Sequence, residues 1–187
     1  MARKWFAVLG LMALLPASGV AWARPARREA VRAVLNARDA VPMTAEGWSR
    51  LGDDVDVYLV EAAGDATLRY AARQRAMSGL GSVRGERART FLHEFVAGGA
   101  GAAPLLSSAV QAYAHGFGKE DAAEAQRLSG ALLAHPDWQV RRGAVRALGE
   151  LGTDEARAML RLHESREAHP AVRIALRSAL ADAPRAR

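Results

Sequence analysis

Apolar residues recur three or four positions apart along most of this chain, the spacing that places them on one face of an α-helix. The clearest example is the segment 138–151, in which Val140, Ala144 and Leu148 fall on one stripe. Apolar residues make up 50% of the chain, many of them alanines, whereas aromatic residues make up only 6%. This pattern predicts an all-α protein of closely packed helices rather than a sheet.

Glycine, proline and acidic residues interrupt the pattern and divide it into helices. Gly152 stands where one helix would end, and Pro170 lies in the turn before the last helix. The expected helices span residues 26–40, 44–51, 55–63, 67–80, 85–97, 105–117, 119–134, 138–151, 153–164 and 172–181. Leu-Gly or Phe-Gly closes three of them, at 80–81, 117–118 and 151–152, at intervals of roughly 35 residues, about the length of two helices and two turns. The sequence therefore predicts about four antiparallel helix pairs.

A short motif opens the second helix of the best-defined pair. Asp137 lies in the turn, and Val140-Arg141 follows in the first part of the helix. The motif returns less completely near Val172 and after Asp65, while the unit that begins near residue 105 keeps only its spacing. The residues that carry the pattern are Asp65, Asp137, Val140, Arg141, Val172 and Arg173.

These residues resemble the HEAT-repeat family, and the resemblance covers roughly residues 53–182. It implies a right-handed HEAT-like α-solenoid, in which each helix pair buries its apolar face against the next pair. It also implies that Arg141 and Arg173 bridge neighbouring repeats and so have a structural role. Tetratricopeptide repeats, with a period of about 34 residues, are the alternative, but their W-x2-L-G-x2-Y pattern is absent from the sequence.

The first 23 residues have the layout of a secretory signal peptide. Arg3 and Lys4 precede an apolar stretch of about eleven residues, which is too short to span a bilayer comfortably, and residues 21–23 form an A-x-A cleavage site. We therefore expect cleavage after Ala23 and export, to the periplasm or as a secreted protein, with a retained anchor as the alternative. The chain has no cysteine, so no disulfide would stabilise the exported protein.

The formal net charge of +6 belongs to the ends of the chain. Basic residues dominate the signal segment, residues 24–42 and the tail at 183–187, whereas residues 43–182 are together nearly neutral. We expect the tail to be disordered. This distribution is weak evidence for nucleic-acid binding, so we expect no nucleic-acid partner. Residues 24–52 are expected to form a basic arm and N-terminal capping helices. The alternative is that the arm at 24–42 contacts a membrane surface, but its apolar face is small for that purpose.

No residue pattern identifies catalytic chemistry. The sequence lacks G-x-S-x-G, S-x-x-K, H-E-x-x-H and phosphate-binding glycine-rich motifs, and without cysteine it has no thiol nucleophile or Cys-ligated metal site. His93-Glu94 and His163-Glu164 resemble the iron-binding His-Glu pairs of deoxyhypusine hydroxylase, a HEAT-like enzyme. Only two pairs occur here in place of four, and they fall near the ends of first helices and two repeats apart. We therefore expect no metal and no cofactor.

Arginines spaced four residues apart are the strongest candidates for a binding surface. By the HEAT resemblance, the second helices of the pairs line a concave face, and the guanidinium fork matches carboxylates and phosphates. The candidate binding residues are Arg69, Arg73, Arg142, Arg146, Arg173 and Arg177. We therefore expect a non-catalytic scaffold that presents this face to another protein or an extended peptide, in particular an acidic one. A membrane-surface accessory factor, and an enzyme or small-ligand binder with an unrecognised site, are the alternatives.

Overall fold

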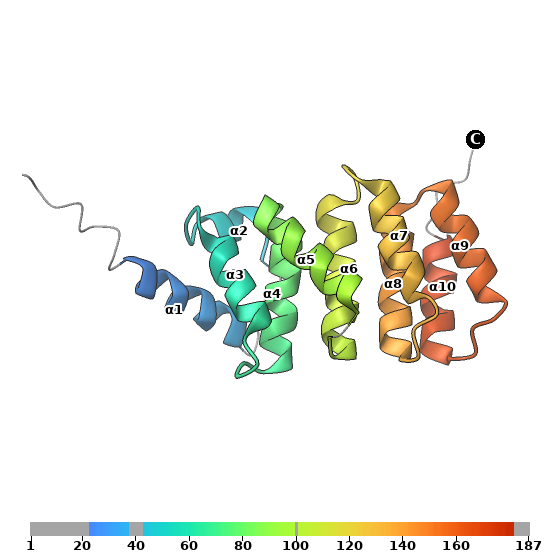
Figure 1. Ribbon diagram of the computed structural model, residues 1–187, viewed down its shortest axis with the longest axis horizontal. Coiled ribbons are helices and arrows are strands. Elements are labelled where there is room, and N and C mark those ends of the chain that lie inside the picture. Colours follow the sequence, from blue (N-terminus) through green and yellow to red (C-terminus); the bar gives the residue numbers. More distant parts are fainter. Residues whose placement is uncertain (1–22, 38–42, 100, 182–187) are drawn as a thin grey trace, which may run out of the picture.

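The computed structural model describes residues 23–37, 43–99 and 101–181. These residues form ten α-helices and no strand, which confirms the all-α prediction (Figure 1). The expected signal peptide, except for Ala23, lies outside the described residues, as does the expected disordered tail at 183–187.

The helices follow one another with short connections. They are α1 (Ala23–Asn36), α2 (Ala45–Ser49), α3 (Val55–Gly64), α4 (Tyr70–Val83), α5 (Glu86–Gly98), α6 (Ala103–Phe117), α7 (Ala122–Leu132), α8 (Trp138–Leu151), α9 (Asp154–Glu164) and α10 (Pro170–Ala181). Several begin at a capping side chain. Asp137 accepts a hydrogen bond from the main-chain N–H of Gln139, and Thr153 accepts one from that of Ala156. Such caps satisfy N–H groups that have no partner within the helix.

The helices from α3 onward form four pairs that stack in chain order. In each pair the first helix packs on the one that follows, and Figure 1 shows the pairs succeeding one another along the long axis. The second helices α4, α6, α8 and α10, here called the second-helix layer, also pack directly on one another. This arrangement confirms the HEAT-like α-solenoid of four helix pairs; its right-handed sense stays a prediction.

The apolar stripes of the helices meet between the pairs. One core of buried side chains runs from α1 to α8, and a second joins α8 to α9 and α10. Phe117, Leu148 and Leu160 are among the largest fully buried side chains. Each side chain of this size contributes about 1.5–3 kcal/mol when it leaves water, so the stacked pairs stabilise one another.

Glycines bring the helices of the second-helix layer into main-chain contact. A Cβ on Gly81 in α4 would lie 2.5 Å from the carbonyl oxygen of Ala112 in α6, and one on Gly116 would lie 2.7 Å from the oxygen of Gly81. Between α6 and α8, a Cβ on Gly143 would lie 2.9 Å from main-chain atoms of Ser107. These distances leave no room for a side chain, so glycine sets the separation of the helices.

Gly81 is therefore not the helix end that the sequence suggested. Helix α4 was expected over residues 67–80, but it begins at Tyr70 and continues through Gly81 to Val83. At its start, Asp65 accepts hydrogen bonds from the main-chain N–H and the hydroxyl of Thr67, which hold the preceding residues in a turn. At the other expected end, Gly152 has the left-handed conformation of a helix C-cap, with φ of 62°.

Helix α1 covers the N-terminal end of the stack. It was expected over residues 26–40, but it begins at Ala23 and ends at Asn36. Its apolar face packs on α3 and α4, where Val31 and Leu35 are fully buried. Three arginines of α1 pair with acids that precede, lie within or follow α3. The pairs are Arg27–Asp54 at 2.9 Å, Arg28–Glu61 at 2.9 Å and Arg32–Asp65 at 2.6 Å.

The main-chain contact at Gly81 predicts that an alanine there destabilises the protein, although alanine usually stabilises a helix relative to glycine. Gly81→Ala should lower the free energy of unfolding by about 1–2 kcal/mol, because overpacking against the α6 main chain outweighs the gain in helix propensity of about 1 kcal/mol. Gly64→Ala is the control, since a Cβ there meets nothing within 4 Å. Urea unfolding followed by circular dichroism should show equal or higher stability for Gly64→Ala. Stabilisation by both substitutions would contradict the proposed contact.

Candidate functional site

A continuous groove runs along the second-helix layer. It consists of three hollows of about 400, 380 and 560 Å³, in order from α4 to α10. Ser78 and Ser82 line both the first and the central hollow, and Glu150 lines both the central and the last. The shared residues join the hollows into one groove that crosses α4, α6, α8 and α10.

The central hollow is lined by small and uncharged polar side chains together with one His–Glu pair. The hydroxyls of Ser78 and Ser108 donate to main-chain carbonyls one helical turn earlier, at 3.2 and 3.0 Å. The amide of Gln111 donates to the carbonyl of Ser107 at 2.7 Å. The hydroxyl oxygens and the amide oxygen can still accept hydrogen bonds. The central hollow therefore presents hydrogen-bonding groups on mostly small side chains.

His115 and Glu150 join α6 to α8 across the central hollow. Nδ1 of His115 lies 2.6 Å from a carboxylate oxygen of Glu150, and both side chains are about half exposed. A His–carboxylate pair of this kind activates a serine when the hydroxyl bonds to the other ring nitrogen. Here the hydroxyls of Ser78, Ser82 and Ser108 donate to main-chain carbonyls instead. The His115–Glu150 hydrogen bond therefore links α6 to α8, and the serine hydroxyls do not have the hydrogen-bond geometry of an activated nucleophile.

The last hollow is basic. Arg142 and Arg146 line it from α8, and Ile174, which is 59% exposed, lines it from α10. The guanidinium of Arg142 lies 5.1 Å from the centre of the Trp138 ring, a cation–π contact that orients it. In the part of the chain that the structure describes, neither arginine has a carboxylate partner, since Glu150 pairs with His115.

The other candidate arginines lie elsewhere. Arg69 precedes α4 instead of lying on it, and its guanidinium donates to the carbonyl of Asn36 at 3.0 Å. Arg73 donates to the carbonyl of Ala63 at 3.0 Å. The two arginines thus satisfy carbonyls at the ends of α1 and α3. The expected pair on one second helix is corrected only in that Arg69 lies just before α4. The remaining pair, Arg173 and Arg177, is exposed on α10 but does not line the groove.

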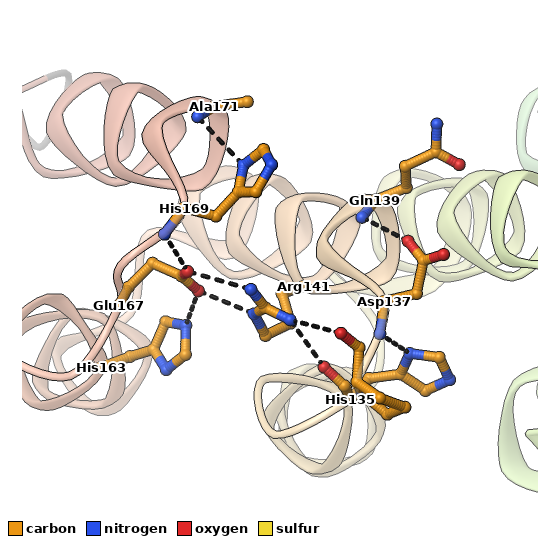
Figure 2. A network of polar contacts seen from close by, with 9 residues as sticks. His135, Asp137, Gln139, Arg141, His163, Glu167, His169 and Ala171 are labelled. Atoms are coloured by element: carbon orange, nitrogen blue, oxygen red, sulfur yellow. Dashed lines mark hydrogen bonds and ion pairs between the residues drawn. The ribbon is translucent and has the colours of Figure 1, made fainter.

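A buried ion pair connects the last two repeats (Figure 2). Arg141 donates to both carboxylate oxygens of Glu167, at 2.7 and 3.0 Å, and Glu167 is almost fully buried. The same guanidinium donates to the carbonyls of His135 and Pro136, each at 2.9 Å. Glu167 also accepts the main-chain N–H of His169 at 2.7 Å. Arg141 therefore holds the turn before α8 against the turn before α10.

The acid in this ion pair was not identified from the sequence. The HEAT resemblance implied that Arg141 bridges neighbouring repeats, but Asp137 of the motif caps α8, and the acid that Arg141 reaches is Glu167. Glu167 lies in the turn between α9 and α10, outside the residues that carry the HEAT resemblance. Arg173, expected to bridge like Arg141, is exposed, because no described repeat follows α10.

The hydrogen bonds of Arg141 lower the pKa of Glu167 to about 2, although burial acts in the opposite direction. Arg127 has the same effect on Glu124, whose pKa also falls to about 2, with His93 as a further hydrogen-bond partner. Both carboxylates are thus strongly held in their ionised form.

The two His-Glu sequence pairs do not form joint sites. His93 contacts Glu124 at 2.6 Å, and His163 contacts Glu167 at 3.1 Å, so each histidine bonds to a glutamate other than its sequence neighbour. Among the described residues, no group of three His, Asp or Glu side chains is arranged to hold a metal ion. No helix of residues 23–37, 43–99 and 101–181 is long and apolar enough to cross a membrane.

The C-terminal part of the chain is similar to a known family. Residues 140–182, which include most of α8 and all of α9 and α10, match the family described as PBS lyase HEAT-like repeat. The match concerns the repeat and assigns no lyase activity to this chain. A comparison with curated proteins found no match.

The buried ion pair predicts acid sensitivity of the last repeat. Because the folded-state pKa of Glu167 lies below its ordinary value of 4.5, its stabilisation is complete above about pH 4.5 and is lost as the pH falls towards 2. Glu167→Gln should lower the free energy of unfolding by about 3 kcal/mol at pH 7. It should also remove much of the pH dependence between pH 4.5 and 2. Urea unfolding across this pH range measures both effects.

Glu164→Gln is the matched control for this prediction. Glu164 is exposed at the end of α9, and its removal changes the formal charge equally. The control should unfold like the wild type at pH 7. Equal effects of the two substitutions would show that the Arg141–Glu167 pair does not hold the repeat.

Proposed function

We propose that this HEAT-like repeat protein is an interaction scaffold whose groove binds an extended segment of a partner protein. Acidic side chains of that segment would lie against Arg142 and Arg146. The observation that carries the proposal is a continuous groove with a polar central hollow, which ends at two arginines without acidic partners among the described residues. The sequence pattern of residues 1–23 supports export, so the partner would be a periplasmic or extracellular protein.

The dimensions of the groove favour an extended chain. The groove crosses four helices, and packed helices lie roughly 8–10 Å apart, which gives a length of roughly 25–30 Å. An extended peptide advances about 3.3 Å per residue, so roughly eight residues would fill the groove. A helix of the same length would be wider, about 10–12 Å with its side chains. The serine, glutamine and histidine side chains supply hydrogen-bond partners for an exposed peptide main chain.

The charge of the last hollow favours an acidic segment. Glu150 is the one acid among the residues that line this hollow, and it pairs with His115. Arg142 and Arg146 therefore keep their positive charge available, and each can form a two-pronged contact with a carboxylate. Three arginines of the basic arm do not add to this surface, since Arg27, Arg28 and Arg32 pair with acids near α3.

Those ion pairs also make membrane contact through the arm the weaker alternative. Membrane attachment needs both an apolar face and unneutralised basic residues. In α1 the apolar side chains Val31 and Leu35 are buried against the first helix pair. The arrangement of groove serines described above likewise supports a non-catalytic role.

Charge reversal tests the proposal. We expect Arg142→Glu combined with Arg146→Glu to weaken partner binding at least about tenfold, because two attractive contacts become repulsive. Partners would be captured in cells through a photo-crosslinking amino acid at Gln111, identified, and then titrated in purified form against each variant.

The control is the double substitution Arg173→Glu with Arg177→Glu. It changes the net charge by the same amount and also alters two exposed arginines four residues apart, but outside the groove. The control should bind like the wild type. Equal loss in both variants would indicate a general effect of net charge and would contradict the proposed site. Circular dichroism of both variants would verify that they fold.

A further inference from the structure

The first hollow of the groove differs in chemistry from the last. It lies where α1, α2 and α4 meet, and its volume of about 400 Å³ lies within the range of ligand pockets, roughly 300–1,000 Å³. Val34, Leu35, Met43, Trp48 and Ala71 give it a mainly apolar wall. Helices α1 and α2 precede the repeats, so this hollow is a feature of the N-terminal cap.

Trp48 forms a fixed part of this wall. Its side chain is only 3% exposed, and its ring lies directly over Gly79 of α4, where a Cβ would come within 3.0 Å of it. Gly79 thus lets the indole approach the helix main chain. Because Trp48 is fixed in this way, little conformational entropy would be lost when an apolar group binds beside it.

The polar side chains in the first hollow are already engaged. Arg75 donates to the carbonyls of Leu35 and Ala37 at the end of α1. Gln74 donates to the carbonyl of Pro104 and to the hydroxyl of Ser108, each at 3.2 Å. A charged ligand group would find no free counter-charge here, whereas an apolar side chain would cover carbon surface.

We propose that the first hollow binds a large apolar side chain of the same partner segment whose acidic residues lie at Arg142 and Arg146. The inference rests on the proposed function, because Ser78 and Ser82 connect this hollow to the rest of the groove. The partner therefore carries a bipartite motif with an apolar anchor at one end and acidic residues at the other. Two to three helix spacings of roughly 8–10 Å separate the ends, so roughly six to eight residues lie between them.

Synthetic peptides test this motif on the full chain. Fluorescein-labelled peptides would carry a tryptophan, a Gly-Ser spacer of two to twelve residues, and three glutamates, and a matched series would carry serine in place of tryptophan. Fluorescence anisotropy should show tightest binding for spacers of roughly six to eight residues, with a gain of about tenfold over the serine series.

Two alanine-to-tryptophan substitutions, one inside the first hollow and one outside it, provide a matched pair of variants. Ala71→Trp places an indole in the hollow from an exposed helix position, whereas Ala158→Trp makes the same change on the exposed face of α9. Ala71→Trp should remove the advantage of the tryptophan peptides and leave the serine peptides unchanged. Ala158→Trp should alter neither series.

The outcomes separate the two proposals. Equal binding of the tryptophan and serine series, or no dependence on spacer length, would overturn the bipartite motif and leave the acidic site standing. No binding of any acidic peptide, or binding that survives Arg142→Glu with Arg146→Glu, would overturn the proposed function as well. A concentration-dependent dimer that Ala71→Trp abolishes would assign the hollow to a second copy of the chain and overturn the motif.

Discussion

The close main-chain contact between the second helices is the constraint on which the rest of the structure depends. Gly81 and Gly116 let α4 and α6 touch, and Gly143 lets α8 approach α6 in the same way. Such contact leaves no room for a side chain at these three positions, and the central hollow beside it is lined by serine and alanine together with Gln111, His115 and Glu150. The small side chains of the central hollow are thus consistent with how closely these helices pack.

The two ends of the stack are held by ion pairs and by arginine donors to main-chain carbonyls. At the N-terminal end, Arg69 and Arg75 bond to carbonyls at the end of α1. At the C-terminal end, Arg141 bonds to the turn before α8 and to Glu167. At the N-terminal end these carbonyls are ones that a helix end leaves without partners, and at the C-terminal end they belong to the turn between α7 and α8. Many arginines of this chain therefore have an architectural role, and Arg142 and Arg146 differ from them in lining the groove without a carboxylate partner among the described residues.

Much of the fold could be predicted from the sequence. All ten helices were expected near their observed positions, because apolar spacing and turn residues are local signals. The errors lie where a tertiary contact changed the meaning of a residue. Glycine is typical of a helix end, but Gly81 lies inside α4. Its lack of a side chain lets the main chain of α4 contact α6 there. The pairing of Arg141 with Glu167 was likewise beyond local patterns, since the acid comes from the following repeat.

The sequence by itself determined the class of the protein, the number of helix pairs and the positions of the turns, because each depends on residues close together in the chain. Tertiary structure alone decided which arginines remain available for a partner. Arg73 and Arg142 each belong to a pair of arginines spaced four residues apart, yet one bonds to Ala63 and the other lines the groove. It also decided that α1 and α2 complete an apolar hollow beside α4. These outcomes depend on which side chains of distant segments meet, and helical spacing does not encode that information.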